Sequence, residues 1–359
     1  MLFRFLTTSS AWLPGSTQQR GAVPHLPHAQ YTGNTGLHSH AQITPATWLS
    51  ALIAISLFAL TAPITEEALA GYSVVSIGAG RGFIGGAIAI MVIQFSGWRL
   101  PGRSALLWIA LSSPGLVFGF PLLITWALTQ ASSADVGVVL AALPMLTSAM
   151  SSLINRRPMT ARFWFWAMAG MALTMGYFMT QSDWSRSAWS QSNWSQSNWS
   201  QSNWSQSNWS QSDSLQDSST QWILLGALLS SSWGYAAGAK AAQCIGGWQT
   251  ICWGQALTAP VCALLFGWSL GHQSAHDTVT TMGSTLALFY LGIFSQLIGF
   301  RFWFQALAVD TPRVSQIQLL QPILTLLALA CFWGAEIGNG QWLAAVGILV
   351  CVLGAMRRQ

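Results

Sequence analysis

Long apolar runs separated by short polar or charged stretches dominate the pattern along this chain. The runs are continuous rather than alternating, and most approach the roughly 20 residues that a helix needs to cross a bilayer. They therefore predict transmembrane helices, because the strands of a membrane barrel would alternate between lipid-facing and lumen-facing residues. The predicted helices are residues 47–65, 74–95, 104–128, 133–155, 161–180, 221–240, 247–268, 281–305, 312–334 and 340–356.

Two polar segments lie outside these runs. Residues 1–46 show no apolar periodicity and are expected to form a disordered tail. Residues 181–220 contain the unit SQSNW four times in succession, from Ser190 to Trp209. A period of five matches neither a helix nor a strand, so this low-complexity segment is expected to be a largely disordered linker on the outer side of the membrane.

The segments on either side of the linker, residues 47–180 and 221–356, resemble each other. Pro144 and Pro322 lie 178 residues apart in similar apolar surroundings, and Trp48 and Trp222 lie 174 apart. Glycines of the fifth and tenth predicted helices correspond in the same way: Gly170 with Gly347, and Gly176 with Gly354. A unit of five helices crosses the membrane an odd number of times, so its second copy is inverted. Inverted repeats are typical of secondary transporters, whose substrate site lies near the midplane between the repeats.

Composition and charge support a membrane location. Charged residues make up 6% of the chain and hydrophobic residues 52%. With the N-terminus in the cytoplasm, twelve of the 14 basic residues fall on the cytoplasmic side, which predicts that both termini are cytoplasmic. The net charge of +5 therefore indicates membrane topology rather than nucleic-acid binding. The expected partners are the lipid bilayer, in a bacterial inner membrane, and a small-molecule substrate; a homodimer is one alternative for the oligomeric state.

The second half resembles the EamA-type members of the drug/metabolite transporter superfamily. The resemblance rests on Pro322, on the G-x-E of Gly334 and Glu336, and on the glycine pair Gly347 and Gly354. Trp233 and Gly234 match the W-G of a first repeat helix, and Arg81 matches an arginine of the second helix. The first half departs from the pattern, since Asn155 and two arginines replace the expected G-E. The resemblance implies a ten-helix carrier, commonly an exporter of amino acids, other metabolites or drugs.

Arg81 is the sharpest candidate for a functional residue. It lies within the run VVSIGAGRGFIGGAIAIMVI, where a charge is unfavourable by several kcal/mol unless it is paired or faces water. The alternative is that Arg81 reaches the outer interface or pairs with Glu66 or Glu67. The surrounding GRGFIG does not indicate a nucleotide cofactor, because no strand precedes it. Gly78, Gly82 and Gly86 are expected to form a smooth helix face for close packing.

Polar and aromatic residues of the later helices are further candidates for a substrate cavity. Gln296 lies in the eighth predicted helix, and Gln318 and Gln321 lie on one face of the ninth. These amides either present themselves to a polar or zwitterionic ligand or bond neighbouring helices. Pro322 is expected to free the carbonyl of Gln318 and, like Pro144, to kink its helix. Phe118 and Trp233 are candidate cavity walls, and Gly347 and Gly354 are expected to serve packing.

Motifs for energy coupling and catalysis are absent from the sequence. It has no G-x-x-x-x-G-K-[ST] loop and no carboxylate near the middle of a predicted helix, so we expect facilitated export or exchange rather than tight proton coupling. Neither a metal nor a cofactor is expected, because the five cysteines show no C-x-x-C spacing. The alternatives are a membrane enzyme, which would need convergent His, Asp or Glu residues, and a noncatalytic scaffold, which leaves the duplication unexplained.

Overall fold

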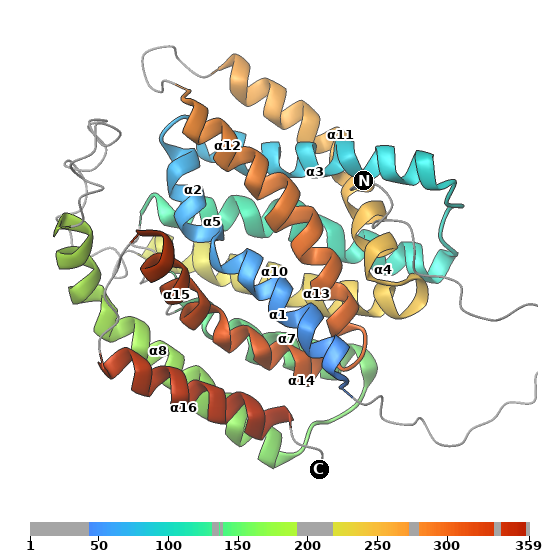
Figure 1. Ribbon diagram of the computed structural model, residues 1–359. Coiled ribbons are helices and arrows are strands. Elements are labelled where there is room, and N and C mark those ends of the chain that lie inside the picture. The colour runs from blue at the N-terminus through green and yellow to red at the C-terminus, as the bar shows by residue number, and fades with distance from the viewer. Residues whose placement is uncertain are drawn as a thin grey trace, which may run out of the picture. The chain divides into compact units, whose positions relative to one another are not determined.

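The structure is a computed structural model that describes residues 43–130, 136, 139–191, 218–272, 280–333 and 339–356 (Figure 1). Every regular element in these ranges is a helix, which confirms the predicted all-α class for this part of the chain. Residues Gln42–Gln359 form one compact unit. The N-terminal tail, most of the SQSNW tract, Gly334 and Glu336 lie outside the described residues.

The helices before the tract follow the predicted ranges closely. Leu60 separates the first two of them, and the elements after α3 up to α5 join end to end. In chain order the elements are α1 (Pro45–Ala59), α2 (Thr61–Leu69), α3 (Val74–Ser96), α4 (Arg103–Ser113), the π-helix η2 (Pro114–Gly119), α5 (Phe120–Leu128), α7 (Leu143–Asn155) and α8 (Ala161–Gln191).

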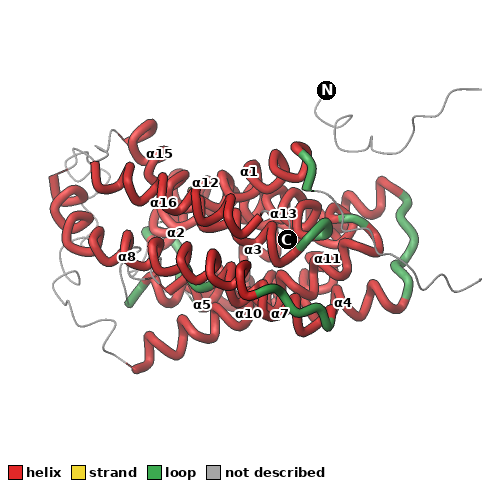
Figure 2. The backbone as a smooth tube through the Cα atoms, turned by 90° about the horizontal axis from the view of Figure 1, so that it is seen from below, coloured by secondary structure: helices red, strands yellow, loops and turns green. Residues whose placement is uncertain are grey.

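The helices after the tract repeat this arrangement. A π-helix again interrupts a long helix, and a short 3₁₀-helix precedes α15. The elements are α10 (Ser218–Ile245), α11 (Gly247–Gly271), α12 (Met282–Tyr290), η3 (Leu291–Gly299), α13 (Phe300–Leu307), α14 (Thr311–Ser315), η4 (Gln316–Leu320), α15 (Gln321–Trp333) and α16 (Asn339–Met356). Figure 2 shows these elements joined by short loops.

Five helical runs among the described residues are long and apolar enough to cross a membrane. They are Pro45–Leu69, Val74–Ser96, Arg103–Leu128, Gly247–Gly271 and Met282–Leu307. Large apolar side chains also remain exposed on the helices, among them Phe95 at 81% and Leu264 at 75%. Such exposure is expected where lipid replaces water. Ten membrane crossings remain a prediction.

The helix before the SQSNW tract is longer than predicted. We expected it to end at residue 180 and the linker to begin at 181, but α8 continues to Gln191. The expectation of disorder is therefore wrong for the first part of the linker. Extending an existing helix fixes one further residue for each hydrogen bond gained, whereas starting one is unfavourable. The polar residues after 180 can thus continue a helix that the apolar run has already begun.

Glycines allow α3 to pack closely against α11. A Cβ atom on Gly82 would lie 2.5 Å from Cys262 Sγ, and one on Gly86 would lie 2.6 Å from Ala259 Cβ. Gly78 faces α5 instead, where Leu122 Cα would lie 3.1 Å away. Residues four apart rotate by about 40° on a helix of 3.6 residues per turn. The predicted glycine face is therefore shared between two neighbours.

The last helix packs against α8, and Figures 1 and 2 both show the two side by side. A Cβ atom on Gly347 would lie 3.2 Å from Leu173 Cδ1, and one on Gly354 would collide with the ring of Trp166. Both glycines thus lie at the contact between α16 and α8, where a larger side chain would separate the helices. On α8, Gly170 approaches Leu319 and Cys351 in the same way.

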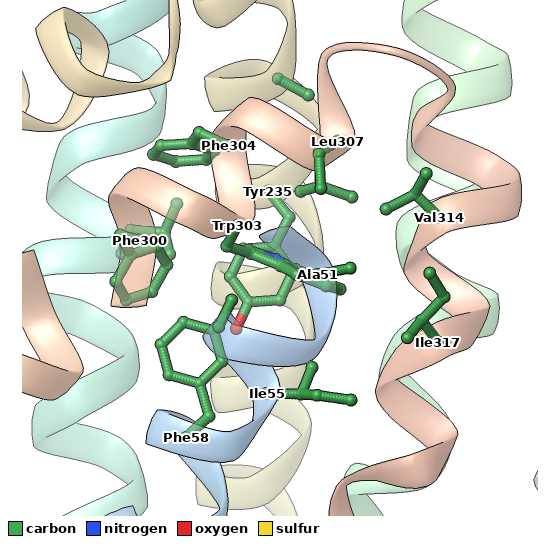
Figure 3. Close-up of a cluster of buried hydrophobic side chains, with 14 of the residues drawn as sticks. Ala51, Ile55, Phe58, Tyr235, Phe300, Trp303, Phe304, Leu307, Val314 and Ile317 are labelled. Carbon is green, nitrogen blue, oxygen red and sulfur yellow. The ribbon is translucent and has the colours of Figure 1, made fainter. Parts of the chain in front are cut away.

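An aromatic cluster joins α1, α10 and α13 in the core (Figure 3). Trp303 is fully buried, and its ring centroid lies 5.9 Å from that of Tyr235 and 6.3 Å from that of Phe58. Phe300 completes the cluster at 5.1 Å from Phe58. The hydroxyl end of Tyr235 points toward Phe58, so the polar end of this residue lies at the edge of the aromatic cluster.

Candidate functional site

Four departures from regular α-helix lie within the predicted membrane helices: the break at Leu60, the π-helices η2 and η3, and the 3₁₀-helix η4. Irregular backbone at membrane depth is tolerated only where protein covers it or where it lines a cavity. The first residues of η2 and η3 lie 177 residues apart and the last 180 apart. These spacings bracket the 178 residues between Pro144 and Pro322, so the two π-helices occupy corresponding positions in the two halves.

Side chains of two other helices close the break between α1 and α2. Three consecutive carbonyl groups accept hydrogen bonds there: Leu57 O from Tyr290 Oη at 3.1 Å, Phe58 O from Gln321 Nε2 at 3.3 Å, and Ala59 O from Thr325 Oγ1 at 2.9 Å. Just after the break, the hydroxyls of Thr61 and Ser295 lie 2.9 Å apart. The break is therefore bonded to η3 and to α15.

Arg81 lies in the second turn of α3, about 10 Å along the helix axis from its start. Its side chain is 2% exposed, and Nη2 donates to Ser295 Oγ at 3.2 Å and to Gln296 Oε1 at 3.1 Å. In the described part of the chain, Nε and Nη1 have no hydrogen-bond partner and Arg81 forms no ion pair. The alternative that Arg81 reaches the interface or pairs with Glu66 or Glu67 is therefore wrong, because its head group is directed inward to η3.

Gln296 connects three helices around Arg81. Its Nε2 donates to the carbonyl of Leu116 in η2 at 3.2 Å, while its own carbonyl accepts from Gln255 Nε2 of α11 at 3.3 Å. Both amides are fully buried, and Gln255 Oε1 has no partner among the described residues. Because a carbonyl can only accept, these two bonds determine which end of each amide is the nitrogen. We name Arg81, Gln255, Ser295 and Gln296 the polar centre.

Gln318 and Gln321 lie beside the polar centre on η4 and α15. Gln318 Nε2 points at Gln321 Oε1 from 3.5 Å, and the Tyr235 side chain interacts with both Gln318 and Arg81. The carbonyl of Gln318 is not freed as we expected from Pro322. It accepts the backbone N–H of Gln321, because the chain tightens into a 3₁₀ turn before the proline.

The two prolines begin helical segments rather than bend continuous helices. Pro144 lies in the first turn of α7 and Pro322 is the second residue of α15, positions where the missing N–H is tolerated. The carbonyl of Pro144 accepts from three side chains: Ser148 Oγ at 2.9 Å, Ser315 Oγ at 3.1 Å and Gln316 Nε2 at 3.2 Å. The Ser148 and Ser315 hydroxyls lie 3.0 Å apart. This cluster bonds α7 to α14 and η4.

The aromatic candidates lie apart from the polar centre. Trp233 is 39% exposed and donates from Nε1 to the carbonyl of Leu111 on α4 at 3.2 Å. Phe118 is half-buried in η2. Neither residue makes a polar contact with Arg81 in the described structure, so only Gln296 of the three outer candidates joins it.

Gln255, Ser295 and Tyr235 are residues that reading the sequence missed. A signal for Gln255 was present, since the 174-residue spacing of Trp48 and Trp222 carries Arg81 onto Gln255. Gly80 then corresponds to Gly254, which makes G-R and G-Q equivalent pairs. Ser295 and Tyr235 had no such signal, because their roles depend on how η3 and α10 turn toward α3.

Comparison with known proteins now decides the family. The sequence profile of the EamA-like transporter family matches residues 46–180 and 220–357. The chain belongs to the EamA-like transporter family. The uncharacterized transporter YdeK of Bacillus subtilis is 26% identical to it over 313 residues, covering 86% of this chain and 96% of YdeK. A crystal structure of another protein shares the fold, with a TM-score of 0.63, 19% identity, and coverage of 86% of this chain and 96% of the other.

Family membership and the apolar helices together establish the broad class. This EamA-like protein is an integral membrane transporter rather than an enzyme by family and by relative, and it has a small-molecule substrate and a lipid environment. The bacterial relative agrees with the expected plasma membrane. The polar centre is where the described structure gathers buried polar atoms at membrane depth.

Proposed function

We propose that this EamA-like protein is a secondary exporter or exchanger of small metabolites, amino acids or drugs. In this proposal it works by alternating access at a cavity between two inverted repeats, residues 47–180 and 221–356. The observation that carries the proposal is the chain of hydrogen bonds from Arg81 through Gln296 to the carbonyl of Leu116, at 3.1 and 3.2 Å. It joins α3 and η2 of one half to η3 of the other.

The matching positions of η2 and η3 support two related halves. A π-helical turn offsets the backbone hydrogen bonds by one residue, and such turns are frequent at functional sites. Side chains of the opposite half serve the carbonyls of η2: Ser230 Oγ donates to Gly115 O at 2.9 Å, and Gln296 Nε2 donates to Leu116 O. Side-chain bonds of this kind are individually worth about 1 kcal/mol, so a rearrangement that exchanges them is inexpensive.

The cluster at Pro144 supports a closed contact between the halves. Ser148 of α7 is bonded to Ser315 of α14, and Gln316 donates to Ser148 Oγ at 2.9 Å. By the predicted topology these residues lie on the cytoplasmic side of the polar centre. In the proposed cycle this contact opens when the site faces the cytoplasm.

Counterflow in proteoliposomes tests the proposal. Vesicles that contain the purified protein are preloaded with an unlabelled metabolite and diluted into a labelled one, using a panel of amino acids, organic acids and drugs. We expect at least one compound to accumulate transiently without a proton gradient. Arg81→Gln should abolish this flux, whereas Gln243→Leu, at an exposed amide of α10 that bonds Ala308 O, should retain it. Flux that strictly requires a proton gradient would contradict the proposed mode of coupling, and equal flux in empty liposomes would contradict transport.

A further inference from the structure

Arg81 carries a buried charge whose remaining donors have no acceptor in the described structure. Nε and Nη1 lack partners, and the two acceptors of Nη2, Ser295 and Gln296, are neutral. We propose that the polar centre binds the carboxylate of the transported molecule, and that the substrates are small organic acids with a hydroxyl or amino group beside the carboxylate. This inference rests on the proposed function and names its substrate class.

The charge of Arg81 supplies the first part of the argument. An ionised group buried without a counter-charge is unfavourable by several kcal/mol, and removing one partner of a buried pair is similarly unfavourable. A guanidinium has five N–H donors and cannot accept. The two neutral acceptors therefore satisfy only part of its bonding capacity. A carboxylate seated against Nε or Nη1 would supply both the missing charge and the missing acceptors.

The orientation of the amides supplies the second part. Gln255 Nε2 donates to the carbonyl of Gln296, so Gln255 Oε1 is the free end of this buried amide. Gln296 also accepts from Arg81, so one residue contacts both of the groups that lack partners. An unpaired acceptor selects a donor. A ligand held by its carboxylate at Arg81 would therefore gain from an O–H or N–H group directed at Gln255 Oε1.

The corresponding positions of the two halves explain why one end of the ligand is charged and the other is not. Arg81 of α3 and Gln255 of α11 are equivalent by the 174-residue spacing, so the site presents one cation and one neutral acceptor. No carboxylate belongs to the polar centre in the described residues. An organic cation would therefore meet the charge of Arg81 without compensation, and the site should reject it.

A matched ligand series tests the inference on the full-length protein in detergent. Thermal unfolding is followed with propionate, L-lactate or L-alanine, and with the amide of each acid, at constant ionic strength. We expect the three acids to raise the unfolding midpoint and their amides to leave it unchanged. L-lactate and L-alanine should raise it more than propionate does, because they carry the extra donor.

Three variants assign the effect to the proposed atoms. Arg81→Gln should weaken lactate binding by about 10- to 100-fold, which corresponds to the loss of a charged hydrogen bond. Gln255→Met should remove the advantage of lactate over propionate and retain propionate binding. Arg301→Gln is the control, because Arg301 on α13 lies over the Trp248 ring at 5.1 Å and outside the polar centre; its response should equal that of the wild type.

Two results would overturn the inference: amides that shift the midpoint as much as the acids do, or an Arg81→Gln protein that still responds to lactate. Failure of all three acids to shift the wild-type midpoint would also overturn it. Counterflow of uncharged compounds by the same preparation would then leave the proposed function intact. Binding of the acids without counterflow of any compound would instead support the carboxylate site and contradict transport.

Discussion

Arg81 and Gln296 are 215 residues apart in the chain and are joined by a hydrogen bond of 3.1 Å between Nη2 and Oε1. The same glutamine donates to the carbonyl of Leu116 at 3.2 Å. One amide thus holds the guanidinium of α3 and bonds the π-helices η2 and η3 to each other. Changes at either residue should therefore affect both the local fold and the proposed site, and the two effects can be separated.

Replacing Arg81 with methionine should abolish transport and stabilise the protein. Methionine fills similar space without a charge that lacks a counter-ion, and replacing buried charges with apolar residues often stabilises a fold by about 1–3 kcal/mol. Unfolding in a denaturant series and counterflow are measured on the same preparation. A variant with reduced stability would show that Arg81 is mainly a structural residue.

Replacing Gln296 with leucine should destabilise the protein by about 2–4 kcal/mol. The change removes the acceptor for Arg81 Nη2 and the donor for Leu116 O, and buried groups left unpaired are unfavourable by about 1–3 kcal/mol each. Gln243→Leu is the control, because Gln243 is an exposed amide of α10 and its loss should change stability by less than about 0.5 kcal/mol. Equal effects of the two changes would show that the amide of Gln296 has no special role.

Replacing Gly86 with alanine should separate α3 from α11. The added Cβ would lie 2.6 Å from Ala259 Cβ and 3.1 Å from the carbonyl oxygen of Gln255, and overpacking of this kind is unfavourable by about 1–3 kcal/mol. Gly267→Ala on α11 is the matched control, since a Cβ there meets no atom within 4 Å. That change should be neutral or stabilise the helix by up to about 1 kcal/mol. The free energies of unfolding of the two variants give the comparison.

Cysteines at positions 148 and 315 should form a disulfide that stops transport. The two serine Oγ atoms lie 3.0 Å apart, so sulfur atoms at these positions are within reach of an S–S bond of about 2.05 Å. Cys244 and Cys331 are exposed and are first replaced with serine. Counterflow should fall on oxidation and recover on reduction, while each single cysteine variant remains unaffected. Undiminished flux in the fully cross-linked protein would contradict opening between α7 and α14.

Shortening the SQSNW tract to a short Gly/Ser linker should leave transport near normal. The tract connects α8 to α10, and the polar centre contains no residue of it. Counterflow is compared at equal amounts of protein in the membrane. Loss of flux at a normal membrane level would show that the tract takes part in transport.

Most of the helical architecture could be predicted from the apolar runs, because a membrane allows few ways to satisfy the backbone. The predicted ranges overlap helical runs of the described structure, including the interrupted runs Arg103–Leu128 and Met282–Leu307. The π-helices themselves were not predicted. Their hydrogen-bond offset leaves no periodic signal in side chains that are apolar on every face. The end of α8 was also missed, since polar residues continued a helix already formed.

The candidate site could be predicted only in part. Arg81 and Gln296 stand out because polar side chains within apolar runs need a partner. Trp233 and Phe118 were chosen on residue type alone, and they lie away from Arg81 in the structure. Aromatic residues are common in membrane helices as packing groups and interface anchors, so their presence does not indicate a cavity.

The sequence by itself determined the helical membrane class, the duplication and the isolated charge of Arg81, because these follow from runs, spacings and residue types along one dimension. Only the tertiary structure decided which groups meet that charge. Arg81 turns to Ser295 and Gln296 rather than to Glu66 or Glu67, and Gln255 presents an acceptor without a partner among the described residues. Such pairings depend on the rotation of each helix about its own axis. Packing sets that rotation, here through glycines such as Gly82 and Gly86 that bring α3 against α11.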